Sequence, residues 1–514
     1  MRLIQHESLI PSLVVCLMGF LLLNKPVHID EANFLMLTQG LFEAPHLVEV
    51  NWQGKTQAAF DVLSNPAGIA WWLWPVRESS EFWMRLWMLP WSILALWGAS
   101  ELGAHFWSYT RPKGAWLLVC TPIFWNAHLS LMPDMPLMAL TFSGYALYFK
   151  GRRGFGALLV GLAFLFRYSA SITILMFLLL PVFKRELWSR GMLWVLFGPI
   201  MLFVWDLYTY GMVHFIQMIG FQSVERTVLD RVHALASLFA MLSGGAISMM
   251  AFSGSWFIWA LSFIVAIVLV VPLGFDIGTL WGLFWVALGV FCVFSQFRKE
   301  GWKSKWVFVG FVLALFFLWQ LRFAATRYWG PFLIFPFLAG IGRQGACIAK
   351  LLCGLVVSLA VSISDFQLAQ IHHQAAEWAE RQSLKYPDAQ GRFFAGHWGF
   401  QHYLQNKGWR AIEEDTAVPN DAILAVTEMA WPQTTDSNCW TLLSSRQIEK
   451  NWGVSVHSPK MRSHFHSNFI SPSGLRSIAP FALGFDQKDR ISLWQRVEEA
   501  SCCQPEAYLC LEKP

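Results

Sequence analysis

Long apolar runs separated by short polar connectors fill the first 364 residues of the chain. A helix of about 20 mainly apolar residues crosses a bilayer, and a shorter one suffices when aromatic residues flank it. About thirteen runs approach this length. They lie near residues 5–23, 82–99, 115–130, 137–149, 155–166, 169–183, 191–209, 234–252, 256–272, 279–297, 306–320, 329–342 and 346–363. The pattern predicts an all-α polytopic membrane protein with about thirteen transmembrane helices, some of them short between residues 131 and 183.

The pattern of apolar positions changes after residue 364. Residues 365–387 have the spacing of an amphipathic helix that ends at Pro387. "RFFAG" at 392–396 and "AILAVTE" at 422–428 are typical of short buried strands, and "GHWGFQHYLQNKG" predicts a helix that closes on Gly408. We therefore expect a transmembrane domain over residues 1–364 and a small soluble α/β domain over residues 365–514.

Charged residues orient this predicted topology. Only 14% of the residues are charged, whereas soluble proteins average about 25%. Cytoplasmic loops of membrane proteins are enriched in Lys and Arg. One set of alternate connectors is basic, as in 150–154 and 184–190, whereas residues 132–136 and 272–278 of the opposite set contain neither Lys nor Arg. This alternation predicts a cytoplasmic N-terminus and places the C-terminal domain on the outer face. The net charge of +5 comes from such short loops, so nucleic acid is not an expected partner.

An adjacent pair of acids, Asp30 and Glu31, follows the first apolar run. The pair opens a long outer segment, residues 24–81, which is too large for a simple connector. Neighbouring carboxylates can act as a general base toward a hydroxyl group or as oxygen ligands of a hard cation. Their crowding is expected to raise the pKa of at least one of them.

Other charged residues on the predicted outer side are candidates for the same site. Asp134 lies in "MPDMP", where an acid at full membrane depth would cost about 2.5–3.5 kcal/mol, so we expect a wet turn or a functional cavity. A divalent metal held by Asp30, Glu31 and Asp134 is left open. Outer-face cations suit an anionic ligand, since Arg binds phosphate in a bidentate manner. These cations are Lys55, Arg167, Arg322 and Arg327, and the aromatic residue Tyr328, next to Arg327, is a further candidate.

Histidine and cysteine give weaker indications. The pairs His372/His373 and His464/His466 have no carboxylate or cysteine at a fixed offset, so we expect exposed histidines rather than metal ligands. Cys439, Cys502, Cys503 and Cys510 are either free or paired in disulfides, and the sequence does not decide between these states. No phosphate-binding loop or dinucleotide fingerprint is present, which argues against a nucleotide-sugar donor or an ATP-driven pump.

Five motifs in order resemble one family of membrane enzymes. They are the early acid pair, "SNPAGIAWW" (64–72), "MPDMPLMAL" (132–140), "GALLVGLAFLFRYSA" (156–170) and "RYWGPFLIFPFLAG" (327–340), and "GHWGFQHYL" in the tail is similar to bacterial members. The chain thus resembles the GT-C glycosyltransferases, in the branch of protein O-mannosyltransferases and lipid A aminoarabinose transferases. The chain departs from the aminoarabinose branch at Asn33 and Phe34, where that branch has Arg-Tyr, so the donor sugar does not follow.

The resemblance implies an activity, a location and roles for several residues. It implies an enzyme of the bacterial inner membrane that moves a sugar from a polyprenyl-phosphate donor to a hydroxyl of a lipid, polysaccharide or protein on the periplasmic side. Asp30 would be the catalytic carboxylate, Glu31 and Asp134 the further acids of the pattern, and Arg327 a cation near the lipid phosphate. The transfer would invert the anomeric centre.

Three other functions are compatible with a polytopic chain. A transporter or flippase would need inverted repeats and ionisable residues at mid-membrane, and neither is evident. An envelope ligase or polymerase would share the lipid-linked donor without requiring the early acid pair. A non-catalytic scaffold would leave the outer acids and cations unexplained.

Overall fold

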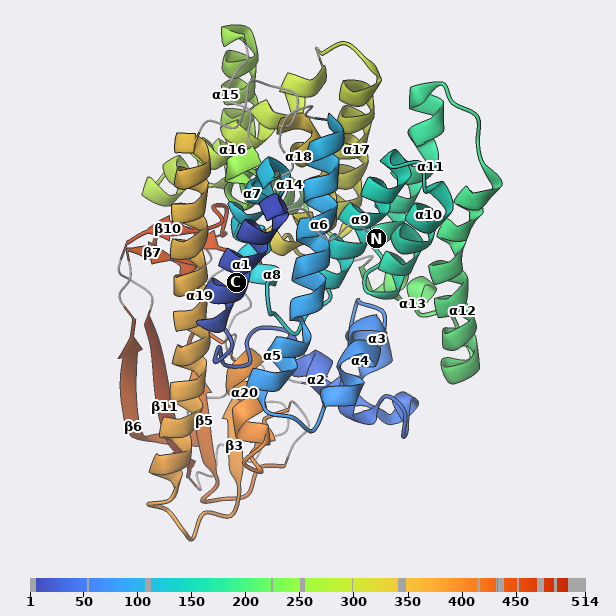
Figure 1. Cartoon of the computed structure of the whole chain (residues 1–514). Coiled ribbons are helices and arrows are strands. Elements are labelled where there is room, and N and C mark those ends of the chain that lie inside the picture. Colours follow the sequence, from blue (N-terminus) through green and yellow to red (C-terminus); the bar gives the residue numbers. More distant parts are fainter. Residues whose placement is uncertain are drawn as a thin grey trace.

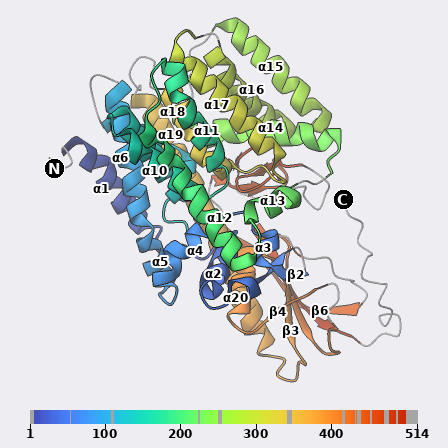
Figure 2. The same ribbon diagram turned by 90° about the vertical axis from the view of Figure 1, so that its right-hand side faces the viewer.

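Helices form most of the chain, and its strands gather mainly in the C-terminal part (Figure 1). The computed structural model describes residues 6–52, 55–106, 112–222, 225–249, 255–297, 299–340, 348–413, 417–430, 432, 439–450, 453–468, 476–484 and 488–497. Two views at right angles show the helices in the upper part of the molecule, with the main sheet at the lower end (Figures 1 and 2).

Within the described residues, 5 helical segments are long and apolar enough to cross a membrane by length and composition. They are Arg190–Tyr210, Trp256–Leu273, Ile277–Phe297, Trp302–Gln320 and Leu351–Ser383, and shorter apolar helices occupy Pro11–Phe20, Arg153–Leu165 and Ala170–Lys184. These segments make the chain an integral membrane protein, as the sequence predicts.

Two of the expected spans are divided in the structure. The run near 115–130 forms α7 (Pro112–Val119) and α8 (Pro122–Ala127), and the run near 329–342 forms the 3₁₀ segment η7 (Thr326–Leu333) followed by α18 (Ile334–Gly340). Proline disfavours helical conformation in the residue before it and removes a backbone donor. Pro122 begins α8, where Thr121 accepts the cap hydrogen bond from the Phe124 amide. The division of the first run therefore has a local cause in its sequence.

One helix connects the membrane part to the C-terminal strands. α19 runs without interruption over Ile348–Ser383, so the expected boundary between residues 364 and 365 falls inside a continuous helix. Figure 1 shows it passing from the upper helices down to the sheet. The sheet order is β4-β3-β5-β11-β6, with β3 parallel to β4 and β5, and β11 antiparallel to β5 and β6. The bounds are β3 Arg392–Ala395, β4 Arg410–Ala411, β5 Ile423–Thr427, β6 Trp440–Glu449 and β11 Lys488–Arg496.

The local elements expected in the tail are present. β3 and β5 occupy the two predicted strand segments, and α20 (Trp398–Gln405) occupies the predicted short helix. Cys439 takes part in a disulfide, whereas Cys502, Cys503 and Cys510 lie outside the described residues.

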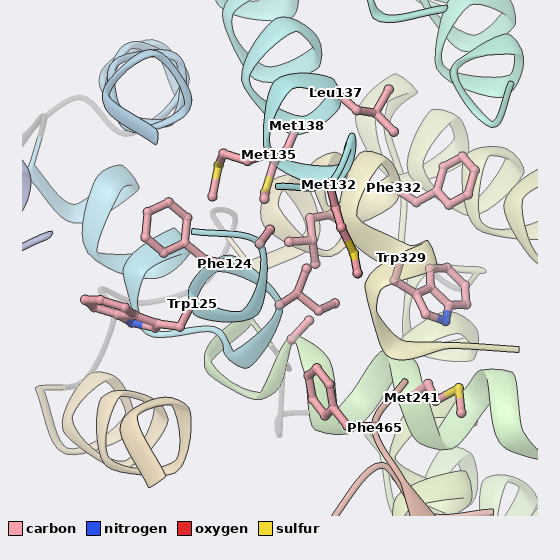
Figure 3. Close-up of a cluster of buried hydrophobic side chains, with 14 of the residues drawn as sticks. Phe124, Trp125, Met132, Met135, Leu137, Met138, Met241, Trp329, Phe332 and Phe465 are labelled. Atoms are coloured by element: carbon pink, nitrogen blue, oxygen red, sulfur yellow. The ribbon is translucent and has the colours of Figure 1, made fainter. Parts of the chain in front are cut away.

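A dense apolar core lies beside the acid-bearing turn at Asp134. Figure 3 shows Met132, Met135 and Met138 facing Phe124 on one side and Trp329 and Phe332 on the other. All six side chains are buried, and the Trp329 indole donates to the carbonyl of Leu238 at 3.0 Å. This packing fixes the start of α9 (Asp134–Phe149) against η7. The start of α9 and η7 lie far apart in the sequence, and both carry candidate site residues. The packing therefore fixes these two segments relative to each other.

The C-terminal segment is also fixed to the membrane helices. Arg462 is fully buried and donates to the Leu273 carbonyl at 2.8 Å and to the Thr279 hydroxyl at 2.7 Å. It also pairs with Asp276 at 3.2 Å. These bonds hold the strand region that precedes His464 and His466 against the start of α16 (Ile277–Phe297).

Candidate active site

The segment that carries the acid pair has a strained backbone. Ile29 has a φ of 49°, a conformation that is a genuine outlier for a β-branched residue. Asp30 follows it as the N-cap of α2 (Glu31–Gly40). The side chains of the two flanking residues have different surroundings: His28 is buried against Asp365 on α19, and Asp30 lines a cavity.

Asp30 is the accessible member of the acid pair. Its side chain is 29% exposed and accepts a hydrogen bond from Arg327, whose side chain is 7% exposed. Burial alone would lower the pKa of the Arg327 guanidinium, but the charge of Asp30 raises that pKa above its ordinary value. The fold thus brings together two candidate site residues that lie 297 positions apart.

Glu31 is enclosed, and both of its carboxylate oxygens are occupied. Oε1 accepts from Arg85, from the Ser130 hydroxyl and from the Leu131 amide, each at 3.0 Å. Oε2 accepts from Arg85 at 2.8 Å and from the His28 amide at 2.9 Å. Burial alone would raise the pKa of Glu31, yet Arg85 lowers it to about 2. The pKa of Glu31 is therefore lowered rather than raised, because a buried guanidinium faces this carboxylate.

Asp134 lies one layer behind the cavity. It begins α9, is buried, and pairs with Arg167. Arg167 lines the cavity and stacks over the Tyr328 ring with its guanidinium carbon 4.5 Å from the ring centroid, while that of Arg327 lies 5.5 Å from the same centroid. The Tyr328 ring therefore has two cations near it, and Asp134 positions one of them.

The cavity has a volume of about 660 Å³ and combines positive charge with apolar walls. Its charged lining consists of two acids, Asp30 and Glu225, and the arginines Arg167, Arg226, Arg231, Arg322 and Arg327. The apolar wall comes from α13 (His214–Gln222) and from the end of α17 (Trp302–Gln320). A site with this lining suits an amphiphilic anion.

Not every candidate from the sequence reaches this cavity. Asp30, Arg167, Arg322, Arg327 and Tyr328 line it. Glu31 and Asp134 support lining residues from behind, and Lys55 lies exposed on the short strand β2 (Lys55–Ala58), outside the lining.

Sequence reasoning missed three arginines. Arg226 and Arg231 lie in a connector predicted on the outer face, so the same exception to the positive-inside rule that indicated Arg322 could have found them. Arg85 lies at the edge of an apolar run, where a single arginine is ordinarily explained by its side chain reaching the headgroups. Only the fold shows that it is buried against Glu31.

The expectation of exposed histidines is wrong for three of the four. His372, His464 and His466 are buried, and only His373 is partly exposed. The Asp30, Glu31 and Asp134 carboxylates each pair with an arginine of their own. In the described part of the chain, the group of potential metal ligands that lies close together is instead His28, Asp365 and His466.

Two solved structures are similar to this chain, and both are of ArnT from Cupriavidus metallidurans. The apo structure aligns at 12% identity with a TM-score of 0.43, over 81% of this chain and 92% of that chain. The structure bound to undecaprenyl phosphate aligns at 13% identity with a TM-score of 0.44, over 82% and 92%. ArnT is the aminoarabinose transferase of the branch that the motifs resemble. No protein-family model and no curated protein matches the chain.

Proposed function

We propose that the chain is a glycosyltransferase that moves a sugar from a polyprenyl-phosphate donor to an acceptor hydroxyl on the outer, periplasmic face of a bacterial inner membrane. The observation that carries the proposal is the lining of a single cavity by Asp30, several arginines and an apolar wall. Each part matches one part of the reaction: a base for the hydroxyl, cations for the phosphate, and apolar surface for the lipid chain.

Asp30 is the proposed general base. Its Oδ2 accepts from Arg327, which leaves Oδ1 to meet the acceptor. As the acceptor oxygen attacks the anomeric carbon, its proton passes to Asp30. The bond between the anomeric carbon and the phosphate oxygen breaks, and its electron pair leaves with the lipid phosphate. A single displacement of this kind inverts the anomeric centre.

Arginine side chains are the proposed phosphate-binding groups. Arg327 lies beside Asp30, and the Arg167 guanidinium carbon lies 4.5 Å from the centroid of the Tyr328 ring. A leaving phosphate is already stable as an anion, so no general acid is needed, and guanidinium groups stabilise the charge that develops on it. Donor binding would draw Arg327 partly away from Asp30, which frees the base when the substrate is in place.

The apolar wall is the proposed path of the polyprenyl chain. Met218 and Phe221 of α13 and Phe317 of α17 line the cavity, and Ile219 is both a lining residue and 54% exposed. Arg226 donates to the carbonyls of Trp319 and Gln320 at 3.0 and 3.1 Å, at the end of α17. A cation at a helix C-terminus is favourably placed. It fixes the end of this wall next to the basic part of the cavity.

The test is transfer from defined donors by the purified full-length chain in detergent. A panel of radiolabelled polyprenyl-phosphate sugars is incubated with envelope lipid, polysaccharide and protein acceptors. Asp30→Asn is expected to lose transfer by at least about 100-fold, the lower part of the range for general-base catalysis, while it keeps donor binding. Asp61→Asn is the matched control, because Asp61 is an exposed acid of the same outer segment. Retained transfer in Asp30→Asn would refute the base assignment, and absence of binding to every donor would refute the proposed function.

A further inference from the structure

A cluster of buried imidazole and carboxylate groups lies behind the cavity. His28 Nε2 is 3.1 Å and His466 Nε2 is 2.5 Å from the same oxygen, Oδ1 of Asp365. One potential ligand atom from each residue lies within 4.8 Å of the other two, and all three residues are buried. They come from three separate parts of the chain: the segment before Asp30, the long helix α19, and the C-terminal segment. Two imidazole nitrogens thus converge on one carboxylate oxygen.

We propose that His28, Asp365 and His466 bind a divalent transition-metal ion of the zinc class. Imidazole nitrogen and carboxylate oxygen are standard zinc ligands, at about 2.0–2.2 Å from the metal. Ligand atoms around a tetrahedral ion at that distance lie about 3.4 Å apart. The two nitrogen–oxygen separations therefore need to open by less than about 1 Å for the three groups to coordinate a common ion.

The surroundings of Asp365 support this assignment. Its second oxygen, Oδ2, accepts from Lys25 Nζ at 2.5 Å and from the Asn126 amide at 3.0 Å. Outer hydrogen bonds of this kind orient a metal-binding carboxylate, and the first oxygen then faces the ion.

A neighbouring histidine is an independent indication of a polar ligand. His372 is fully buried, and among the described residues neither of its ring nitrogens has a hydrogen-bond partner. Its ring centroid lies 5.7 Å from that of His28, and the His28 and His466 centroids lie 5.1 Å apart. Buried polar groups are nearly always satisfied in native proteins. A bound ion with its remaining coordination position filled by water or by a rotated His372 would supply the missing partner.

Such an ion would order the loop next to the proposed base, Asp30. His28 is two residues before Asp30, and the strained Ile29 lies between them. An ion held by α19 and the C-terminal segment would fix this loop from the side opposite the cavity. His466 both belongs to the cluster and lines the cavity, so the ion would also fix part of the cavity wall.

The test is metal retention by the purified full-length chain, which uses no sugar donor and is therefore independent of the proposed function. The protein is stripped with a chelator, loaded with excess Zn²⁺, passed through gel filtration and analysed by mass spectrometry for zinc. The wild type is expected to keep about one zinc per chain, and His466→Ala about ten-fold less or lower. His46→Ala removes an exposed histidine from the outer segment 24–81, which also carries His28. This control variant is expected to match the wild type. A wild type that retains no more zinc than His466→Ala overturns the proposal.

A spectroscopic test covers the case in which His466→Ala does not fold. Co²⁺ is added to the stripped wild type, where visible ligand-field bands of a nitrogen- and oxygen-bound ion are expected. In His466→Cys, which keeps a metal-binding side chain, a thiolate-to-cobalt charge-transfer band should appear in addition. Absence of the bands in the wild type overturns the site, and absence of the charge-transfer band in a folded His466→Cys overturns His466 as a ligand.

Discussion

Substitution of each acid of the pair should separate a reactive carboxylate from a structural one. In Glu31→Gln the side chain keeps its shape but loses its charge and replaces one acceptor oxygen with an NH₂ donor. The new NH₂ group would point at the N–H groups of Arg85 or at the His28 amide, which are themselves hydrogen-bond donors. In Asp30→Asn the corresponding change occurs at a side chain that is 29% exposed to solvent. We expect the first variant to lose stability and the second to lose transfer.

The expected size of the stability loss follows from burial. Both partners of the Glu31–Arg85 pair are 1% exposed, and breaking a buried ion pair by removing one charge costs about 3–5 kcal/mol. Unfolding entropy is about 2.1 cal/mol/K per residue, or about 1.1 kcal/mol/K for a chain of this length. The unfolding midpoint of Glu31→Gln should therefore fall by about 3–5 °C. Asp30→Asn should shift the midpoint less, because water reaches its side chain.

The pH dependence of this loss gives the prediction a second signature. The folded-state pKa of Glu31 is lowered from 4.5 to about 2, so the charged carboxylate stabilises the fold fully above pH 4.5 and progressively less as the pH falls toward 2. The midpoint difference between wild type and Glu31→Gln should accordingly be constant near neutral pH and shrink in acid. The assay is thermal unfolding in detergent, followed by intrinsic fluorescence, together with the transfer assay.

A double-mutant cycle is the control for the pairing itself. Arg85→Met alone should be destabilising, and adding Glu31→Gln to it should cost clearly less than Glu31→Gln costs in the wild type, since the two residues interact directly. Rescue will be incomplete, because Arg85 also donates to the carbonyls of Lys25, Pro26 and Leu129. An unchanged midpoint in Glu31→Gln, or strictly additive costs in the cycle, would refute the assignment of Glu31 as a structural acid.

Three further predictions concern the cavity and the buried cluster. Arg322→Ala should weaken binding of polyprenyl phosphate by about 10- to 100-fold in a detergent binding assay, the effect of losing one charge-assisted contact, while the exposed control Lys407→Ala keeps wild-type affinity. Asp134→Asn should lower affinity for the donor less than Arg167→Ala does, because it loosens the Arg167 side chain without removing its charge; an equal or larger effect would count against a positioning role. Because burial lowers the pKa of His28 from 6.5 to about 4, the unfolded chain binds more protons in that range, so stability should fall as the pH drops from about 6.5 to 4; His28→Gln should flatten this slope in thermal melts.

Part of the site could be predicted because the position of a residue relative to the apolar runs indicates the side of the membrane on which it lies. The place of Asp30 after the first apolar run and of Arg327 before the last ones put both on the outer side, and the fold brings them into contact. The tail strands β3 and β5 could also be predicted from the sequence, because a short apolar run bounded by Gly or charged residues is typical of a buried strand.

The unpredictable part depended on tertiary burial. His466 lies 101 residues from Asp365, and His28 lies 337 residues from it, so no local spacing indicated that the three would meet. "HFH" looks exposed because its flanking residues are polar, yet the start of α16, through Arg462, and the middle of α19, through Asp365, enclose it. A charged or polar side chain needs a partner only where it is buried, and only the fold shows which of these side chains are buried and against what.

The three acid–arginine pairs then differ in one physical respect, which is access to solvent. Acid and arginine are 1% and 1% exposed in the Glu31–Arg85 pair and 3% and 10% in the Asp134–Arg167 pair, whereas in the Asp30–Arg327 pair the acid is 29% exposed. A base must receive a proton from a substrate that arrives from outside, so an enclosed carboxylate whose two oxygens are filled cannot serve. The same enclosure makes Glu31 suited to hold the loop, since its hydrogen bonds with Arg85, Ser130 and Leu131 connect that loop to other segments. In the proposed mechanism, adjacent acids that look equivalent in sequence therefore have different roles: Glu31 holds the backbone, and Asp30 accepts the proton of the acceptor hydroxyl.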